Sequence, residues 1–216
     1  MTDFLTHYYR KDKPPFQSMS YLSDAEAEHV GMTLLRENPK AFSRFRKFQT
    51  YWSRRKQTDQ WVQSEFKKKG GIPIEPYPQY MVLGSSSYIS ALGDDGGYVE
   101  LRIPLSEFDP KEVSFTYSDC MVSRYISKYE RDKAYFNPDI HGKVFTLPEI
   151  LDIVKVHGIP NGEWETDPTK VFDFFVEAQV WSLRPLKKYM EKYSKEIKSN
   201  PKGRSIVSQS KLTVYP

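Results

Sequence analysis

Short apolar and aromatic runs alternate with turn residues through the middle of the chain. Three such runs, near residues 79–89, 98–105 and 112–117, are rich in β-branched and aromatic side chains. Glycine, serine, aspartate and proline separate them, which is typical of β-strands joined by turns. Similar runs near 4–9 and 173–181 lie toward the two ends of the chain. The pattern therefore predicts a central, mainly antiparallel sheet built from five segments.

Helical signals lie between these runs. Two segments begin with a hydroxyl residue that is followed three residues later by glutamate, the spacing of a capping box. They predict helices near residues 24–36 and 147–157, and a lysine-rich segment predicts a further helix near 185–198. We expect these helices to cover the sheet.

The longest predicted helix covers residues 41–69, which contain neither proline nor glycine. Its aromatic residues recur mostly every three to five positions, which predicts one helix, or two joined near Thr58, with the rings on one side. Gly70 and Gly71 are expected to end it. The rings are those of Phe42, Phe45, Phe48, Trp52, Trp61 and Phe66.

The composition is that of a folded domain. The 216 residues are 38% hydrophobic and 15% aromatic, which suffices for a core. Because no linker is long enough to divide the chain, we predict a single α+β domain over residues 1–198 and a C-terminal tail over 199–216. The polar segment 127–142 has no clear period and is predicted to be a surface loop.

Charge, cysteine content and hydropathy indicate the compartment. The formal net charge is only +4, which is weaker than the signature of a dedicated nucleic-acid-binding protein. The one cysteine, Cys120, cannot form a disulfide within the chain, which favours a reducing compartment. The first residues lack the pattern of a signal peptide, and no apolar run is long enough to span a bilayer. We therefore expect a cytoplasmic protein.

Several familiar sites are absent from the sequence. It has neither glycine-rich nucleotide-binding motif, no C-x-x-C or H-E-x-x-H, and no G-x-S-x-G. The four histidines are scattered, so we expect no metal site. Cys120 lies beside Met121 and Val122 and is interpreted as a small core residue rather than a nucleophile.

Three segments taken in order carry a resemblance to known proteins. They are "FLTHYYR" with His7, "VELRIPLSEFDPKEVSFTYSDCMVS" in mid-chain, and "FFVEAQVWSLRPLKKY" with Glu177. Their order resembles that in ADP-ribosyltransferases, particularly the DNA-modifying toxins of the DarT type. The chain also looks like an uncharacterised bacterial protein family with similar "HYYRK", "YMVLG", "HGKVFTL" and "EAQVW" segments.

The resemblance implies an NAD-dependent enzyme. Cleavage of the nicotinamide–ribose bond builds positive charge on the ribose, which a carboxylate stabilises. Glu177 would be that carboxylate, and His7 would orient a ribose. Substrate contacts would include stacking by Tyr8, Tyr9 or Tyr88 on nicotinamide and pairing of Arg10 or Arg102 with the pyrophosphate.

Each of these residues also has a structural interpretation. Glu177 would face solvent if only Val176 and Ala178 pack inward, or it would pair with a buried arginine such as Arg102 or Arg184. His7 would then be a hydrogen-bonded core residue, and Asp119, which follows a serine, would serve a turn or a helix cap.

A second hypothesis concerns the predicted helix 41–69, whose Lys40–Lys69 region carries ten lysines and arginines against two acids. Such a helix is able to lie along a phosphate backbone while aromatic rings stack on unpaired bases, or to dock an acidic protein. The alternative is a solvated helix whose rings point into the core. The candidate nucleic-acid contacts are Arg44, Lys47, Trp52, Arg54, Arg55 and Lys56.

Overall fold

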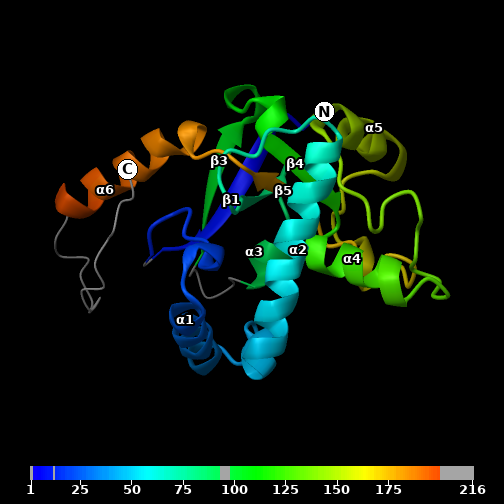
Figure 1. Cartoon of the computed structure of the whole chain (residues 1–216), viewed down its shortest axis with the longest axis horizontal. Coiled ribbons are helices and arrows are strands. Elements are labelled where there is room, and N and C mark those ends of the chain that lie inside the picture. The colour runs from blue at the N-terminus through cyan, green and yellow to red at the C-terminus, as the bar shows by residue number, and fades with distance from the viewer. Residues whose placement is uncertain (1, 12, 93–97, 200–216) are drawn as a thin grey trace.

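The computed structural model describes residues 2–11, 13–92 and 98–199, and its strands form one sheet (Figure 1). All strand pairs are antiparallel, and the strand order is β3-β1-β2-β5-β4. The predicted α+β class and antiparallel sheet are therefore confirmed. The strands are β1 (Phe4–Arg10), β2 (Gln79–Leu83), β3 (Tyr98–Pro104), β4 (Val113–Tyr117) and β5 (Val176–Val180).

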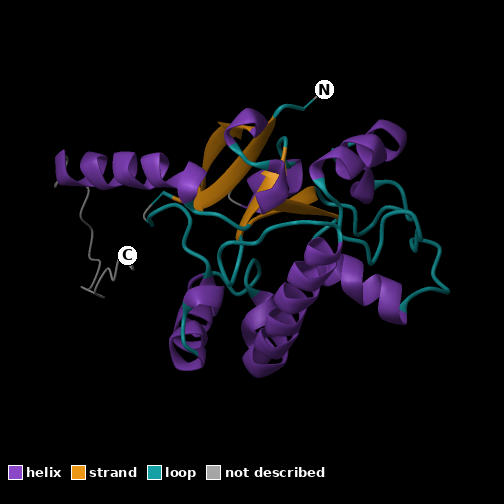
Figure 2. Ribbon diagram, turned by 45° about the horizontal axis from the view of Figure 1, so that its top comes forward, coloured by secondary structure: helices purple, strands orange, loops and turns teal. Residues whose placement is uncertain are grey.

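Six α-helices accompany the sheet in the described part of the chain (Figure 2). The two predicted capping boxes, at Ser23–Glu26 and Thr146–Glu149, are both formed. Single 3-10 turns precede or join several elements, and α6 points away from the body of the protein. The helices are α1 (Asp24–Glu37), α2 (Phe48–Lys68), α3 (Ser87–Leu92), α4 (Cys120–Tyr129), α5 (Leu147–His157) and α6 (Lys187–Ser199).

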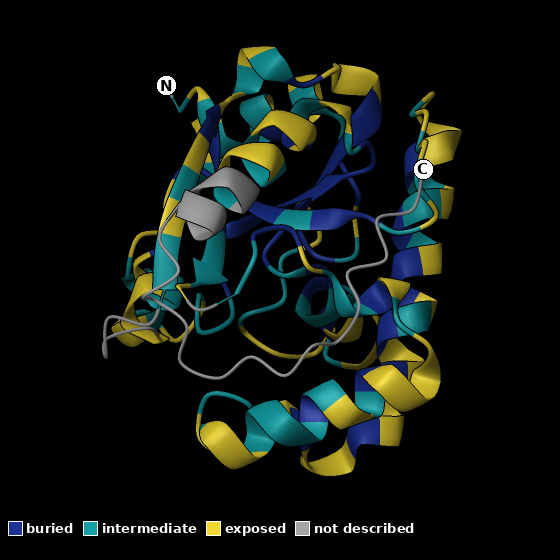
Figure 3. Cartoon of the chain, turned by 90° about the vertical axis from the view of Figure 1, so that its left-hand side faces the viewer, coloured by how far each residue is buried: buried dark blue, intermediate teal, exposed yellow. Residues whose placement is uncertain are grey.

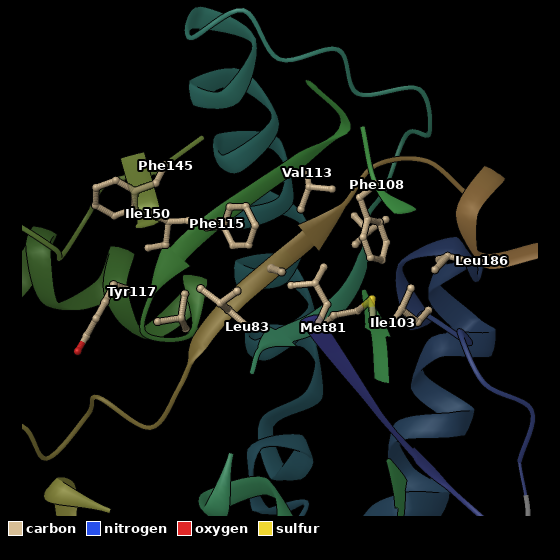
Figure 4. Packing of buried hydrophobic residues seen from close by; sticks show 14 of the residues in the cluster. Met81, Leu83, Ile103, Phe108, Val113, Phe115, Tyr117, Phe145, Ile150 and Leu186 are labelled. Carbon is tan, nitrogen blue, oxygen red and sulfur yellow. The ribbon is translucent and has the colours of Figure 1, made fainter. Parts of the chain in front are cut away.

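One face of the sheet carries the main apolar core (Figure 4). Met81, Leu83 and Phe115 project from the strands toward Ile150 of α5 and Leu186, which lies just before α6. Burial of such side chains stabilises a fold by about 1.5–3 kcal/mol each. This face therefore anchors α5 and the first turn of α6.

The opposite face of the sheet is polar, yet many of its residues are buried. Figure 3 shows the burial along the central strands. Thr6, Thr116, Glu177 and Gln179 alternate along their strands with the core residues, and helices cover them. Val62 and Phe66 of α2 pack there with the neighbouring elements in a smaller apolar cluster. The sheet is thus enclosed on both sides, and its polar side holds the candidate site.

A second contact holds α1 against the start of α2. Phe45, Phe48 and Trp52 bury their rings beside Ala27 of α1. Figures 1 and 2 show these two helices side by side below the sheet. The aromatic rings at the start of α2 therefore pack inward, which agrees with the alternative that these rings point into the core.

Three predicted boundaries were wrong. The run 79–89 leaves the sheet after Leu83, because Gly84 adopts φ +74° and α3 follows. The predicted loop 127–142 begins inside α4, a helix capped by Asp119 through the N–H groups of Met121 and Val122. The segment predicted as the helix 41–69 begins with a 3-10 turn before α2 and then continues unbroken through Thr58.

Two predicted segments lie outside the described residues. These are the turn residues 93–97, which separate the runs 79–89 and 98–105, and nearly all of the predicted tail, residues 200–216.

Candidate functional site

Glu177 lies on β5, between β2 and β4, with its side chain on the polar face. Its register partners are Val82 on one side and Thr116 on the other. Only 4% of Glu177 is exposed, because α2 and α4 pack over this part of the sheet. The carboxyl is therefore an interior group, and it does not face bulk solvent as the first structural interpretation required.

A chain of buried hydrogen bonds leads to Glu177 across β4 and β5. The Trp181 indole Nε1–H donates to Ser114 Oγ at 2.9 Å, and Ser114 Oγ donates to Gln179 Oε1 at 2.9 Å. The Gln179 amide nitrogen then donates to Glu177 Oε1 at 3.0 Å and to Thr116 Oγ1 at 3.1 Å. One carboxylate oxygen is therefore fixed by side chains that are themselves buried.

The inner side of α2 contributes a buried ion pair. Arg55 Nε lies 2.9 Å from Asp59 Oδ1, and the guanidinium carbon lies 3.8 Å from the ring centroid of Tyr80. Asp59 also accepts hydrogen bonds from the hydroxyls of Tyr80, at 2.6 Å, and Ser20, at 2.8 Å. The Asp59 carboxylate therefore contacts three side chains, and its ion pair holds the Arg55 guanidinium over the Tyr80 ring.

Arg55 has one buried nitrogen without a hydrogen-bond partner. Only 9% of the residue is exposed, and among the buried side-chain nitrogens and oxygens of the described chain Nη2 alone has no partner. Burial alone would lower the pKa of the Arg55 guanidinium, but negative charge on its neighbours, Asp59 among them, raises the pKa, so the guanidinium stays charged. An unsatisfied buried donor on a charged group is costly and calls for an explanation.

Asp119 and Cys120 bring further chemistry to Glu177 from the start of α4. The ligand atoms of these three residues lie within 4.8 Å of one another, and this is the group of described residues with spacing suited to a metal ion. The Cys120 thiol also hydrogen-bonds the Glu177 carboxyl. Asp119 Oδ1 is occupied by two backbone N–H groups, at 2.8 and 3.1 Å, so Asp119 acts first as a helix cap.

Burial dominates the ionisation of this cluster. It raises the pKa of Glu177 to about 8, with a further increase from Asp119 and an opposing effect from Arg55, Gln179 and Cys120. Burial and the neighbouring Glu177 also raise the pKa of the Cys120 thiol. A thiol that stays protonated is a poor nucleophile, so the geometry agrees with the interpretation of Cys120 as a core residue.

The structure does not bring the predicted catalytic pair together. Thr6 is in register with Val82, which is in register with Glu177, so these three share the polar face. His7 is the next residue along β1 and therefore points to the opposite face, where it stacks on Phe16 at 4.2 Å. Its pKa falls to about 3 because it is buried. His7 is a core residue, as its structural interpretation predicted.

The predicted substrate contacts are divided in the same way. Tyr9 stacks on His7 and lies on the apolar side of β1, whereas Tyr8, Arg10 and Arg102 share the face of Glu177. Arg102 is three strands away, roughly 14 Å at the usual strand spacing, and it lines a hollow at the sheet edge.

The remaining predicted contacts have other partners. Arg10 pairs with Glu37 of α1, and Arg102 pairs with Glu100 at 3.0 Å. Tyr88 stacks on Phe174 at 4.1 Å. None of these three residues is in the cluster around Glu177, and Arg184, which was considered as its partner, pairs with Glu112 instead.

The structure also changes the nucleic-acid hypothesis. Trp52 and Arg55 are buried on the inner side of α2, so neither of these two predicted contacts lies on the surface of the helix. Lys56 is half-buried and binds Asp24 at 2.9 Å. Arg44, Lys47 and Arg54 are exposed, and Arg44 lies over the ring of Phe45. The exposed side of the helix is therefore basic, but the rings that would stack on bases face inward.

Sequence reasoning missed Arg55, Asp59 and Gln179 as neighbours of Glu177. A signal was available for the first two. They are separated by four residues, and they continue the three-to-four-residue spacing of Trp52, Val62 and Phe66 along one side of α2. Two charged residues on an apolar stripe indicate a buried ion pair.

Comparison of the chain with protein-family models, with curated proteins and with solved structures finds no match. Among the helices that the structure describes, none combines the length and apolar character needed to cross a membrane. The site is therefore interpreted from its own geometry.

Proposed function

We propose that the protein is an enzyme whose catalytic group is the carboxyl of Glu177, and that it transfers ADP-ribose from NAD. The observation that supports this most is the buried guanidinium of Arg55, which has an unsatisfied nitrogen and is electrostatically coupled to Glu177. An unsatisfied buried donor and a buried carboxyl with a strongly raised pKa both cost stability, so a purely stabilising role does not account for the cluster. Perturbed groups of this kind are enriched at catalytic sites. The resemblance to ADP-ribosyltransferases supplies the substrate.

The reaction requires little from the protein beyond charge and position. As the bond between ribose C1′ and the nicotinamide nitrogen breaks, its electron pair neutralises the pyridinium ring and positive charge develops on the ribose. The ionised Glu177 carboxylate stabilises that charge. An acceptor, water in the simplest case, forms the new bond to C1′ and loses its proton to the carboxylate or to solvent.

Access to Glu177 sets a condition on this proposal. Because Glu177 is only 4% exposed, the ribose reaches it only if the cover formed by α2 and α4 moves. Asp119 caps the start of α4, lies close to the Glu177 carboxyl and is partly exposed. We therefore expect the ribose to enter past the start of α4.

The test is release of nicotinamide from NAD by the purified protein. Glu177→Gln keeps the shape of the side chain and one acceptor oxygen but removes its charge, and we expect it to lower the rate by a factor of at least about 100. Glu112→Gln is the matched control, because Glu112 is also a buried glutamate but pairs with Arg184 away from the cluster. Equal rates in the wild type and Glu177→Gln would overturn the proposal.

A further inference from the structure

We infer that Gln179 is a positioning residue, which holds the Glu177 carboxyl in one orientation through a hydrogen-bond chain that begins at Trp181. The inference rests on the proposed function, since it describes how that function's carboxyl is placed. It concerns the geometry of Glu177 and can be tested without any turnover.

The direction of the first bond in the chain is fixed by its donor, and the later bonds are consistent with it. The indole N–H of Trp181 can only donate, so Ser114 Oγ must accept from it. The Ser114 hydroxyl hydrogen is then directed to Gln179 Oε1. This leaves the amide nitrogen on the side of Glu177, so Gln179 presents an N–H donor to the carboxyl. A flipped amide would place two oxygens against each other.

The backbone register keeps the four groups in place. Ser114 is the cross-strand partner of Gln179, and Thr116 is the partner of Glu177. The second amide hydrogen of Gln179 bonds Thr116 Oγ1, diagonally across the same strand pair. All of these side chains are buried, so solvent does not compete for the bonds. The amide is therefore held by two hydrogen bonds besides the one it makes to Glu177 Oε1, and the indole bond orients Ser114.

The hydrogen-bond chain reaches the Glu177 carboxyl through one of its two oxygens. Oε1 receives the Gln179 amide, and this bond favours the ionised form of Glu177. This bond restrains the orientation of the carboxyl through Oε1. Loss of the amide donor would both release the carboxyl plane and disfavour its negative charge.

The experiment measures the pKa of Glu177 by NMR titration of the protein carrying 13C-labelled glutamate carboxyls, with Glu177→Gln identifying the signal. Gln179→Leu removes the donor to Glu177, and Ser114→Ala removes the bond that orients the amide together with the acceptor of the Trp181 indole. Gln79→Leu, a buried glutamine on β2 in register with Val180, is the control. Nicotinamide release is measured on the same samples.

We expect the pKa of Glu177 to rise by about one to two pH units in Gln179→Leu and by less in Ser114→Ala, with no change in Gln79→Leu. Turnover should fall roughly 10- to 100-fold in Gln179→Leu with little change in KM. An unchanged pKa in folded Ser114→Ala and Gln179→Leu overturns the inference whatever the activity. A raised pKa in a protein that never releases nicotinamide supports the positioning role and counts against the proposed function.

Discussion

The imidazole of His7 accepts a hydrogen bond from the backbone N–H of Phe16, with 2.9 Å between Nε2 and the nitrogen, and stacks on the ring of the same residue. Phe16 has a positive φ of 61°, which non-glycine residues rarely adopt. The other ring nitrogen, Nδ1, lies 3.2 Å from the carbonyl oxygen of Tyr80. Since Nε2 accepts, Nδ1 carries the proton, and the neutral tautomer ties the loop after β1 to the sheet.

This arrangement predicts acid sensitivity. The pKa of His7 is lowered to about 3, from 6.5 in the unfolded chain, so the unfolded state binds the extra proton between these values and stability falls as the pH drops below 6.5. Between pH 6.5 and 5 the His7 contribution should decrease by about 2 kcal/mol. The measurement is urea unfolding of the wild type and of His7→Gln at both pH values. The His7 contribution is the change in unfolding free energy of the wild type minus that of His7→Gln.

The matched control is His29→Gln, which changes an exposed histidine of α1. It should follow the wild type across the same pH range. If His7→Gln loses as much stability on acidification as the wild type does, the buried neutral imidazole is not the source of the effect.

The raised pKa of Glu177 predicts that stability depends on pH in the opposite direction. Its folded pKa of about 8 exceeds the unfolded value of 4.5, so the folded state holds one more proton between them and stability falls as the pH rises through this window. Glu177→Gln should match the wild type near pH 5 and exceed it by roughly 3–5 kcal/mol above pH 8. Denaturant unfolding at pH 5 and pH 8.5 checks this, and a constant gap at both pH values would contradict it.

The activity of the proposed enzyme should show the same ionisation. Catalysis by an ionised carboxylate predicts that kcat/KM for nicotinamide release rises tenfold per pH unit below about pH 8 and levels off above it. The measurement is a pH–rate profile from pH 6 to pH 9.5, within the range where the wild type stays folded. A rate that is highest at low pH would show that protonated Glu177 is the active form, acting as a general acid.

Breaking the Arg55–Asp59 ion pair within α2 should strongly lower the free energy of unfolding. Asp59→Asn keeps the side-chain shape but leaves the buried charge of Arg55 uncompensated, which should cost about 3–5 kcal/mol of unfolding free energy. Thermal or urea unfolding measures the loss. The double variant Arg55→Met/Asp59→Asn removes both charges and should recover much of it.

Lys68→Ala provides the comparison, because Lys68 forms an exposed pair with Glu65 on the same helix. That change should cost under about 1 kcal/mol. Similar losses for Asp59→Asn and Lys68→Ala would mean that the inner pair is solvated.

Local signals were sufficient for much of the fold. The capping boxes at Ser23 and Thr146 predicted helix starts because a cap is built from residues three positions apart. The strand cores followed from β-branched and aromatic runs in the same way. The helix α4 was not predicted, although Cys120, Ser123 and Ile126 recur three positions apart on its buried side and Asp119 was interpreted as a turn or cap residue.

The site required information that a single sequence does not contain. Glu177 was recognisable as an acid in an apolar run, but its neighbour Arg55 comes from a helix 122 positions earlier in the chain. The pairing of His7 with Glu177 failed for a related reason. Adjacent residues of a strand point to opposite faces, so a shift of one position in register decides which of Thr6 and His7 shares a face with Glu177.

The place of β5 in the sheet has a consequence for synthesis of the protein. β1, β2 and β3 are able to pair once residue 104 has left the ribosome, whereas β4 has only β5 as a strand neighbour within the described sheet. Its edge stays open until Val176–Val180 emerge and insert between β2 and β4. Until β5 emerges, the nascent chain therefore carries a three-stranded sheet and the separate strand β4. Stalled or truncated products that end before residue 176 should be prone to aggregation.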